Sequence, residues 1–245
     1  MTTPVPYEQA VNRELVTIDE IYPRLQNQSS ALRESPGMGY RPLMDHESSL
    51  VRFIQGKPGT YKPHTDSVQA FLDQYEKPNQ NSENVHECQD GPPPPGKVCY
   101  FNLDLLGNDC TWQNDYGFDE GKPCFVLKLN KIYGWIPQEH KSANEVPEPI
   151  RERFRPDHMP VYCEGEGPLD KENIGNVTYL PPEGFPLKYY PYLNQEGYRA
   201  PIVMVKFENI TNGMVINVIC RTYAKNIKHN RNDQLGSVLF SLLVD

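Results

Sequence analysis

The chain has 245 residues, and its 24 Lys and Arg against 32 Asp and Glu give a formal net charge of −8 at pH 7. A chain this acidic gains nothing from the phosphate electrostatics that dominate nucleic-acid binding, which excludes DNA and RNA as expected partners. The 24 prolines and 17 glycines predict short elements joined by many turns, and they exclude helical bundles and coiled coils.

The N-terminal part of the chain predicts little regular structure. Residues 1–24 are polar and permit at best a short amphipathic helix. No stretch of the sequence approaches the roughly 18 to 20 consecutive apolar residues that a membrane helix needs. Residues 25–63 carry Pro and Gly at short intervals, which favours an extended strap lying on the protein surface.

One helix is predicted over about residues 66–76. Asp66 and Gln69 are placed like a capping box at its start, and Pro78 follows its end. Its apolar side chains recur at helical spacing, at Val68, Phe71, Leu72 and Tyr75. Residues 25–80 therefore form one predicted unit, a strap plus a helix.

The rest of the chain, residues 81–245, predicts a β-sandwich. Gly91 to Gly96 enclose four prolines and predict an exposed polyproline loop. After this loop the apolar period changes to two, which is typical of half-buried strands; these are predicted at 99–105, 125–129, 203–207, 214–220 and 238–242. Asn212-Gly213, between two of these runs, predicts a hairpin. Short alternating strands with little helix favour an antiparallel, immunoglobulin-like sandwich.

Six cysteines predict disulfides rather than a zinc site, because no two have the C-x2–4-C spacing; they are Cys88, Cys99, Cys110, Cys124, Cys163 and Cys220. Fifteen pairings are possible, and sequence alone does not choose among them, although we favour sequential pairing. On that pairing the last bridge closes the longest loop and contributes about 4 kcal/mol, against about 3 kcal/mol for each short bridge. The alternative is six free buried thiols in a cytosolic protein.

Three N-glycosylation sequons begin at Asn27, Asn176 and Asn209. They fit the same oxidising, glycosylating compartment that the cysteines indicate. We therefore expect an extracellular or lumenal protein.

No catalytic, cofactor or metal site is predicted, because G-x-S-x-G, H-E-x-x-H and G-x-G-x-x-G are all absent. Residues 91–97 match the start of a phosphate-binding loop, but their four prolines have no N–H to offer a phosphate.

The six histidines are scattered and are predicted to be surface residues. One acidic run favours a solvated loop over a calcium site; it contains Glu164, Glu166, Asp170 and Glu172.

An aromatic cluster is the strongest candidate for a binding surface. Tyr189, Tyr190 and Tyr192 surround Pro191, and aromatic side chains with polar tips are enriched at protein interfaces. A packed corner of the sandwich explains the same cluster equally well, so both interpretations stay open on the residues alone.

Several ordered motifs resemble the β-subunits of the Na,K-ATPase and H,K-ATPase family. The resemblance covers about residues 20–245, and residues 36–42 resemble invertebrate members in particular. The motifs are Tyr116-Gly117-Phe118, Glu120-Gly121-Lys122-Pro123-Cys124, Lys128-Leu129-Asn130-Lys131, Gly134, Gly175-Asn176-Val177, Gly184-Phe185-Pro186-Leu187, Tyr189-Tyr190-Pro191-Tyr192, Cys220, Tyr223-Ala224 and Asn226-Ile227.

The resemblance implies a non-catalytic membrane glycoprotein that uses no cofactor. Its ectodomain, residues 25–245 here, is expected to be an immunoglobulin-like sandwich with a packed helix on the extracellular side of the plasma membrane. Its partner would be the catalytic α-subunit of a P-type cation ATPase, whose folding, membrane delivery and K+ affinity it supports.

The resemblance also implies roles for particular residues. It pairs Cys88 with Cys99, Cys110 with Cys124 and Cys163 with Cys220, in agreement with the sequential pairing. Asn209 matches a glycosylation position of the family. The segment Tyr189–Tyr192 matches a run near the α-subunit contact, which favours an interface over a packed corner.

One departure from the family pattern affects the expected location. Residues 1–24 stand where family members carry a transmembrane helix, so the chain is expected either to reach the membrane through its complex or a missing N-terminal helix, or to be secreted. The alternative function is a binding or adhesion module that acts independently of the pump. An enzyme is the third class, and it would need a cleft with a convergent His and carboxylate.

Overall fold

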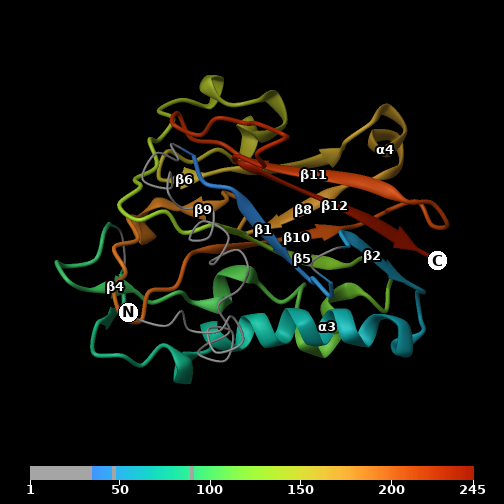
Figure 1. The fold of residues 1–245 in the computed structure, drawn as a ribbon, viewed down its shortest axis with the longest axis horizontal. Coiled ribbons are helices and arrows are strands. Elements are labelled where there is room, and N and C mark those ends of the chain that lie inside the picture. Colours follow the sequence, from blue (N-terminus) through green and yellow to red (C-terminus); the bar gives the residue numbers. More distant parts are fainter. Residues whose placement is uncertain (1–34, 46–47, 89–90) are drawn as a thin grey trace, which may run out of the picture.

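Two four-stranded sheets face each other in the computed structural model, which describes residues 35–45, 48–88 and 91–245 (Figure 1). The first sheet has the order β1 (Met38–Arg41), β5 (Cys124–Leu129), β10 (Ile202–Phe207), β8 (Val177–Leu180). The second has the order β2 (Leu50–Phe53), β12 (Ser237–Val244), β11 (Ile216–Thr222), β7 (Val161–Gly165). The expected mainly-β, antiparallel sandwich is confirmed, with one parallel pair, β2 with β12.

Aromatic side chains from both sheets fill the space between them. Phe125 of β5 stacks on Phe240 of β12 with ring centroids 4.6 Å apart, and Phe207 of β10 meets Phe125 edge-on at 5.5 Å. Tyr40 of β1 stacks on Phe240 at 4.8 Å. Large aromatic rings bury much apolar area and gain from offset and edge-to-face contact, so this cluster holds the two sheets together.

The segment expected to be a surface strap supplies a strand to each sheet. β1 pairs with β5 in the first sheet, and β2 pairs with β12 in the second. Tyr40 and Phe53 are buried between the sheets. The prediction of a surface strap is therefore wrong for 38–41 and 50–53, because long-range pairing overrides the local Pro and Gly signals. Residues 1–24 and the Asn27 sequon lie outside the described residues.

The main helix begins earlier than predicted. α3 spans Pro58–Leu72 and continues as a 3-10 turn over Asp73–Tyr75, so the expected capping box at Asp66 is wrong. Pro58 occupies the first turn, where its missing N–H costs nothing. Tyr61, His64 and Val68 are buried against the sheets, and this burial stabilises the helix despite Pro63 inside it.

Four of the predicted strands are confirmed with small shifts of their ends: β5, β10, β11 and β12. The strand at 99–105 is wrong, since only β4 (Val98–Cys99) pairs, with β3 (Val85–His86), and Leu103–Leu106 is a 3-10 turn. The Asn212-Gly213 hairpin is also wrong, because β10 and β11 belong to different sheets. A second small sheet pairs β6 (His158–Met159) with β9 (Phe185–Pro186).

β5 is buried on both faces rather than one. Lys128 on its outer face is only 5% exposed, and its Nζ lies 5.4 Å from the centre of the Phe71 ring of α3. The helix therefore covers the outer face of the first sheet, which the sequence pattern of one half-buried strand does not reveal.

Three disulfides link the cysteines in sequence order: Cys88–Cys99, Cys110–Cys124 and Cys163–Cys220. The last joins β7 to β11 at directly opposed positions within one sheet, whereas antibody domains use a bridge between sheets. None of the helices in the described residues is long and apolar enough to cross a membrane.

Candidate partner-binding surface

The tyrosine segment leaves the small β6–β9 sheet through a 3-10 turn, Leu187–Tyr189. Tyr189 points inward and is only 4% exposed. Its hydroxyl donates a 3.0 Å hydrogen bond to the Tyr100 carbonyl, and its ring lies 5.5 Å from that of Phe101. Burial raises the pKa of this phenol above its usual range. Tyr189 is therefore a packing residue.

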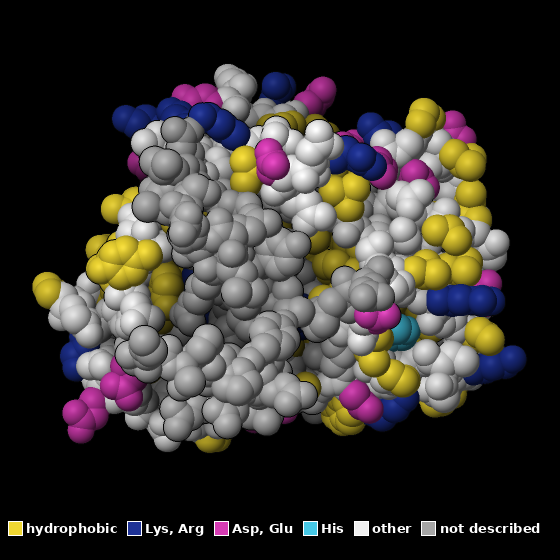
Figure 2. Space-filling model, in the orientation of Figure 1, with side chains coloured by type: hydrophobic (Ala, Val, Ile, Leu, Met, Phe, Trp, Pro, Cys, Tyr) yellow, Lys and Arg dark blue, Asp and Glu magenta, His cyan; other side chains and the backbone are white. Residues whose placement is uncertain are grey.

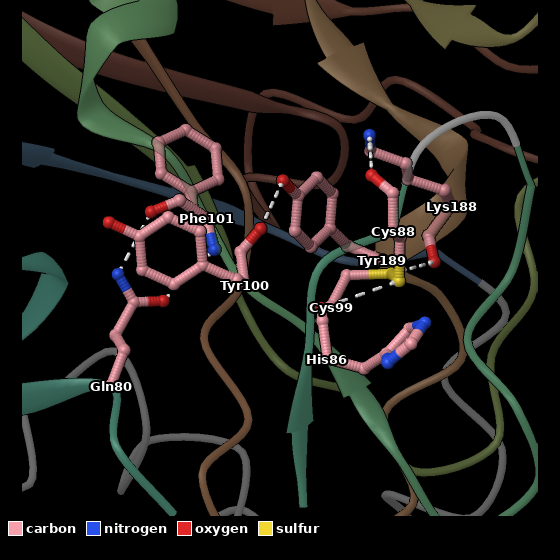
Figure 3. Close-up of a disulfide and its surroundings, with 8 residues drawn as sticks. All are labelled: Gln80, His86, Cys88, Cys99, Tyr100, Phe101, Lys188 and Tyr189. Carbon is pink, nitrogen blue, oxygen red and sulfur yellow. Dashed lines mark hydrogen bonds between the residues drawn. A yellow bond between two sulfur atoms is a disulfide. The ribbon is translucent and has the colours of Figure 1, made fainter. Parts of the chain in front are cut away.

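A disulfide fixes the chain beside this tyrosine, as Figure 3 shows. The Lys188 ammonium donates to the Cys88 carbonyl at 3.0 Å, next to the Cys88–Cys99 bridge. On the other side of Tyr189, the Gln80 amide donates to the Phe101 carbonyl and accepts from the Phe101 N–H. These contacts hold the start of the tyrosine segment rigidly to the loop that precedes it.

Tyr190 packs edge-on against Trp135, with ring centroids 5.7 Å apart. The Tyr190 hydroxyl and the Trp135 indole N–H are both buried, and neither has a hydrogen-bond partner in the described part of the chain. Burial raises the pKa of the Tyr190 phenol well above its usual value. Tyr190 is half-buried as a whole, so it anchors the segment with one edge near the surface.

Tyr192 lies nearer to solvent and connects two loops. Its carbonyl accepts a 2.8 Å hydrogen bond from the Gly134 N–H, which aligns residue 192 beside Tyr133. The Tyr192 ring lies 5.0 Å from the ring of buried Tyr198, and Lys131 Nζ sits 5.2 Å from its centre. Tyr198 and Lys131 thus fix the position of the Tyr192 ring, and part of the residue stays accessible to solvent.

Large apolar side chains lie exposed beside this pairing. Tyr133 is 71% exposed, Ile136 61% and Leu193 46%. Together with Tyr192 these residues define what we call the Tyr192 surface. Figure 2 shows hydrophobic side chains at the left edge of the molecule, the end that carries β9 in Figure 1. Exposed aromatic and aliphatic groups on a rigid backbone are typical of protein interaction sites.

The sequence pattern marks the tyrosine segment as a candidate surface but does not mark Tyr133, Ile136 or Leu193. The structure brings Tyr133 beside Tyr192, which is far from it along the chain. Ile136 lies three residues after Tyr133, and Leu193 directly follows Tyr192. A possible signal was the presence of large apolar residues in stretches that have neither helical nor strand periodicity.

The two described sequons occupy neighbouring surface positions at the other end of the sandwich. Asn176 and Asn209 are both exposed, and the Asn176 carbonyl accepts a 2.9 Å hydrogen bond from the Glu208 N–H. Each side chain is therefore open to carry a glycan.

The acidic run is used in internal contacts. Glu164 accepts from Lys171 at 3.0 Å and from Arg221 at 2.7 Å, and Asp170 accepts from two backbone N–H groups. Nearby cations hold the pKa of Glu164 below its usual value, although burial opposes them. The described residues hold no group of three ligand-type side chains placed to bind a metal.

The prediction that the histidines are surface residues is wrong for His64. Its ring is buried in α3 against Phe118, and its Nε2 lies 3.0 Å from the Arg52 carbonyl. Burial lowers the pKa of this histidine, while the backbone hydrogen bond acts in the opposite direction. His64 is therefore a structural link between the helix and β2.

A family model described as the sodium/potassium ATPase beta chain matches residues 10–240. The chain belongs to this family. The match covers α3, all three disulfides and both sheets except the last four residues of β12, so the fold described above is that of a family member.

Similar proteins from several animals belong to the same beta-chain family. The chain is 39% identical to the sodium/potassium-transporting ATPase subunit beta-2 of Drosophila melanogaster, over 94% of this chain and 77% of that protein. It is 34% identical to a probable subunit beta-3 of Caenorhabditis briggsae, over 94% and 72%. It is 28% identical to human subunit beta-2, over 94% and 78%.

Proposed function

We propose that this chain acts as the β subunit of a P-type sodium/potassium-transporting ATPase and contributes no catalytic residue to it. The observation that carries this proposal is the family match over residues 10–240, supported by relatives named as subunits of that pump. In this role the chain helps the catalytic α subunit to fold and reach the plasma membrane, and it tunes the affinity for extracellular K+.

Three disulfides and two exposed sequons support a position on the extracellular side of the membrane, because both features belong to oxidising compartments. In this position the sandwich is a rigid extracellular domain that binds the α subunit. Association with the membrane runs through the complex with the α subunit or through an N-terminal transmembrane helix.

The contact with the α subunit is assigned to the Tyr192 surface. The most exposed side chain there is Tyr133, and tyrosine is enriched among the anchors that dominate the energy of protein interfaces. The backbone beneath them is held by the Gly134–Tyr192 hydrogen bond and by the packing of Tyr190 on Trp135. A preorganised surface loses little entropy on binding, which favours a stable complex.

Co-purification with a pump α subunit tests the role. The chain is expressed behind a secretory signal and, in parallel, behind an added N-terminal apolar span, each together with the α subunit. Capture by both versions supports the role and shows that the sandwich suffices. Capture by the spanned version alone supports the role and adds a need for the span. Failure of both versions contradicts the role.

Two matched variants test the surface. Tyr133→Ser combined with Leu193→Ser should reduce capture of the α subunit at least tenfold and shift K+ activation of the pump. Leu169→Ser is the control, because Leu169 is 60% exposed but lies on α4 (Pro168–Asn173) at the other end of the sandwich. An equal loss of capture in both variants would argue against the Tyr192 surface.

A further inference from the structure

A cavity of about 540 Å3 opens along one edge of the sandwich. β8 ends the strand order of the first sheet and β7 ends that of the second, so no strand of the described residues closes the gap between them. The cavity is lined from β7, β8 and α4. Its volume falls in the range of about 300–1,000 Å3 that is typical of ligand sites. The proposed pump role does not use it.

The cavity wall combines fixed polar groups with apolar faces. The Arg153 guanidinium lies 4.0 Å from the centre of the Tyr179 ring and donates a 2.8 Å hydrogen bond to the Pro182 carbonyl. Glu164 and Lys171 pair at 3.0 Å on another part of the wall. Such a wall fits a ligand with hydroxyl and amide groups at its edges and C–H groups on its faces, which describes a pyranose sugar.

A sequon lies directly on this wall. Asn176 and Thr178, its first and third residues, both line the cavity, and Asn176 is exposed. A glycan on Asn176 therefore starts at the cavity rim. Asn209, whose backbone lies close to Gly175, does not line the cavity, although its side chain is equally exposed. The chain thus offers two neighbouring sequons that differ in access to one cavity.

We propose that the cavity between β7 and β8 holds the first N-acetylglucosamine residues of an N-glycan on Asn176. A covalent tether raises the effective sugar concentration at the cavity to roughly the millimolar range, so weak contacts suffice for occupancy. The seated sugar fills the open edge of the sandwich and covers strand edges that would otherwise be free to pair with another chain. This inference stands independently of the pump role, since it concerns only the sequon and the cavity.

Glycan release under native conditions tests the proposal. The full chain is secreted from animal cells, and glycopeptides at Asn176 and Asn209 are quantified by mass spectrometry after timed treatment with a peptide N-glycosidase, which must reach the innermost sugar. We expect release from Asn176 to be at least tenfold slower than from Asn209 in the folded protein. After reduction and unfolding the two rates should agree. Absence of a glycan on Asn176, or equal native rates, would overturn the proposal.

Two neighbouring substitutions on α4 test the cavity itself. Lys171→Trp places a large ring on the cavity wall, whereas Glu172→Trp changes an exposed neighbour that does not line it. Release from Asn176 should rise to the Asn209 rate in the first variant and stay slow in the second. Equal behaviour of the two variants would contradict the proposal.

A second measurement does not depend on secretion of the Lys171→Trp variant. The Asn176→Gln protein leaves the cavity without a tethered glycan, and free chitobiose is titrated into it while amide resonances are followed by NMR. Changes in the amide chemical shifts of β7, β8 and α4 that saturate with millimolar affinity would support sugar binding in the cavity. No shift at ten millimolar chitobiose would overturn it.

Discussion

The side-chain amide of Gln80 and the backbone of Phe101 exchange two hydrogen bonds, of 2.8 and 2.9 Å, across 21 residues of chain. Both groups are buried, and the loop between them contains the Cys88–Cys99 bridge (Figure 3). The hydrogen-bonded pair and the disulfide therefore fix the same loop at two different points, and this loop supports Tyr189.

Gln80→Leu should be strongly destabilising because it leaves the N–H and C=O of Phe101 buried without partners. Each orphaned group costs about 1–3 kcal/mol, so we expect a loss of about 2–4 kcal/mol in the free energy of unfolding. Urea denaturation measures this loss. Gln195→Leu serves as the control, because the Gln195 side-chain oxygen accepts from the Leu193 N–H at an exposed site, where water can replace it. Similar losses in both variants would show that the buried pair has no special weight.

Tyr189 and Tyr192 should separate stability from binding. Tyr189→Ala removes a buried ring and its hydrogen bond to the Tyr100 carbonyl, so we expect a loss of about 3–5 kcal/mol in stability. Tyr192→Ala should cost much less stability and should reduce α-subunit capture more. Thermal melting and co-purification are compared on the same preparations. Loss of stability and capture in equal proportion at Tyr192 would favour packing over an interface.

Loss of the Cys163–Cys220 bridge should be more damaging than loss of Cys88–Cys99. The first closes a separation of 57 residues and the second only 11. In the chain-entropy model the expected costs are about 4 and about 3 kcal/mol. Double Ala variants of each pair are compared by urea unfolding in the absence of reductant. A larger loss from the short loop would argue that native packing, rather than unfolded-chain entropy, decides the ranking.

Stability should fall on mild acidification because His64 is buried. Burial lowers its pKa in the folded state, so the unfolded chain binds a proton first as the pH falls below about 6.5. The unfolded state then holds more protons, and the free energy of unfolding decreases by up to about 1.4 kcal/mol per pH unit. The Arg52 carbonyl keeps the proton on Nε2, so the added proton would lie on buried Nδ1, which has no partner among the described residues.

Urea midpoints between pH 5 and 7 measure this slope. His64→Phe should flatten it, whatever its effect on absolute stability at pH 7. His229 remains in the variant and keeps its own contribution to the slope, because desolvation of its ring also lowers its pKa although the residue as a whole is exposed. An unchanged slope in His64→Phe would assign the acid sensitivity to other groups.

Two glycines at the sequon end should respond differently to Ala. Both have positive φ, +69° at Gly175 and +76° at Gly213, so each substitution carries backbone strain of about 1–2 kcal/mol. A Cβ at Gly175 would also lie 2.3 Å from the Asn209 carbonyl oxygen, whereas Gly213 has open space. Gly175→Ala should therefore lose clearly more stability in thermal melts than Gly213→Ala. Equal losses would mean that the Asn209 backbone shifts at little cost.

The elements that could be predicted from sequence are those with a clear local period. β5, β10 and β12 combine alternating apolar residues with nearby turn signals. The residues on the apolar side of each strand could therefore be predicted as core residues. β1 and β2 could not be predicted, because each is four residues long and its pairing partner lies far along the chain. Asn212-Gly213 predicted a hairpin wrongly because a local turn does not determine whether the strands on either side of it join the same sheet.

The candidate surface was predictable only in part. The density of tyrosines marked residues 189–192, but composition does not separate Tyr189, which is buried, from Tyr192, which is partly exposed. That distinction depends on the loop that carries Tyr100 and Phe101, because the Tyr189 hydroxyl bonds to the Tyr100 carbonyl and its ring packs on Phe101. Exposure of Tyr133 and Leu193 depends on a bridge between two distant loops.

β12 lies between β2 and β11, inside its sheet rather than at an edge. During synthesis β2, β7 and β11 all emerge before residues 237–244, and β2 has no other partner among the strands of its sheet. β7 and β11 can pair before that point, but β2 cannot join the second sheet until β12 has been made. The free edges of β2 and β11 must therefore wait for this last strand, which leaves them open to wrong pairing or to chaperone binding until synthesis passes residue 244.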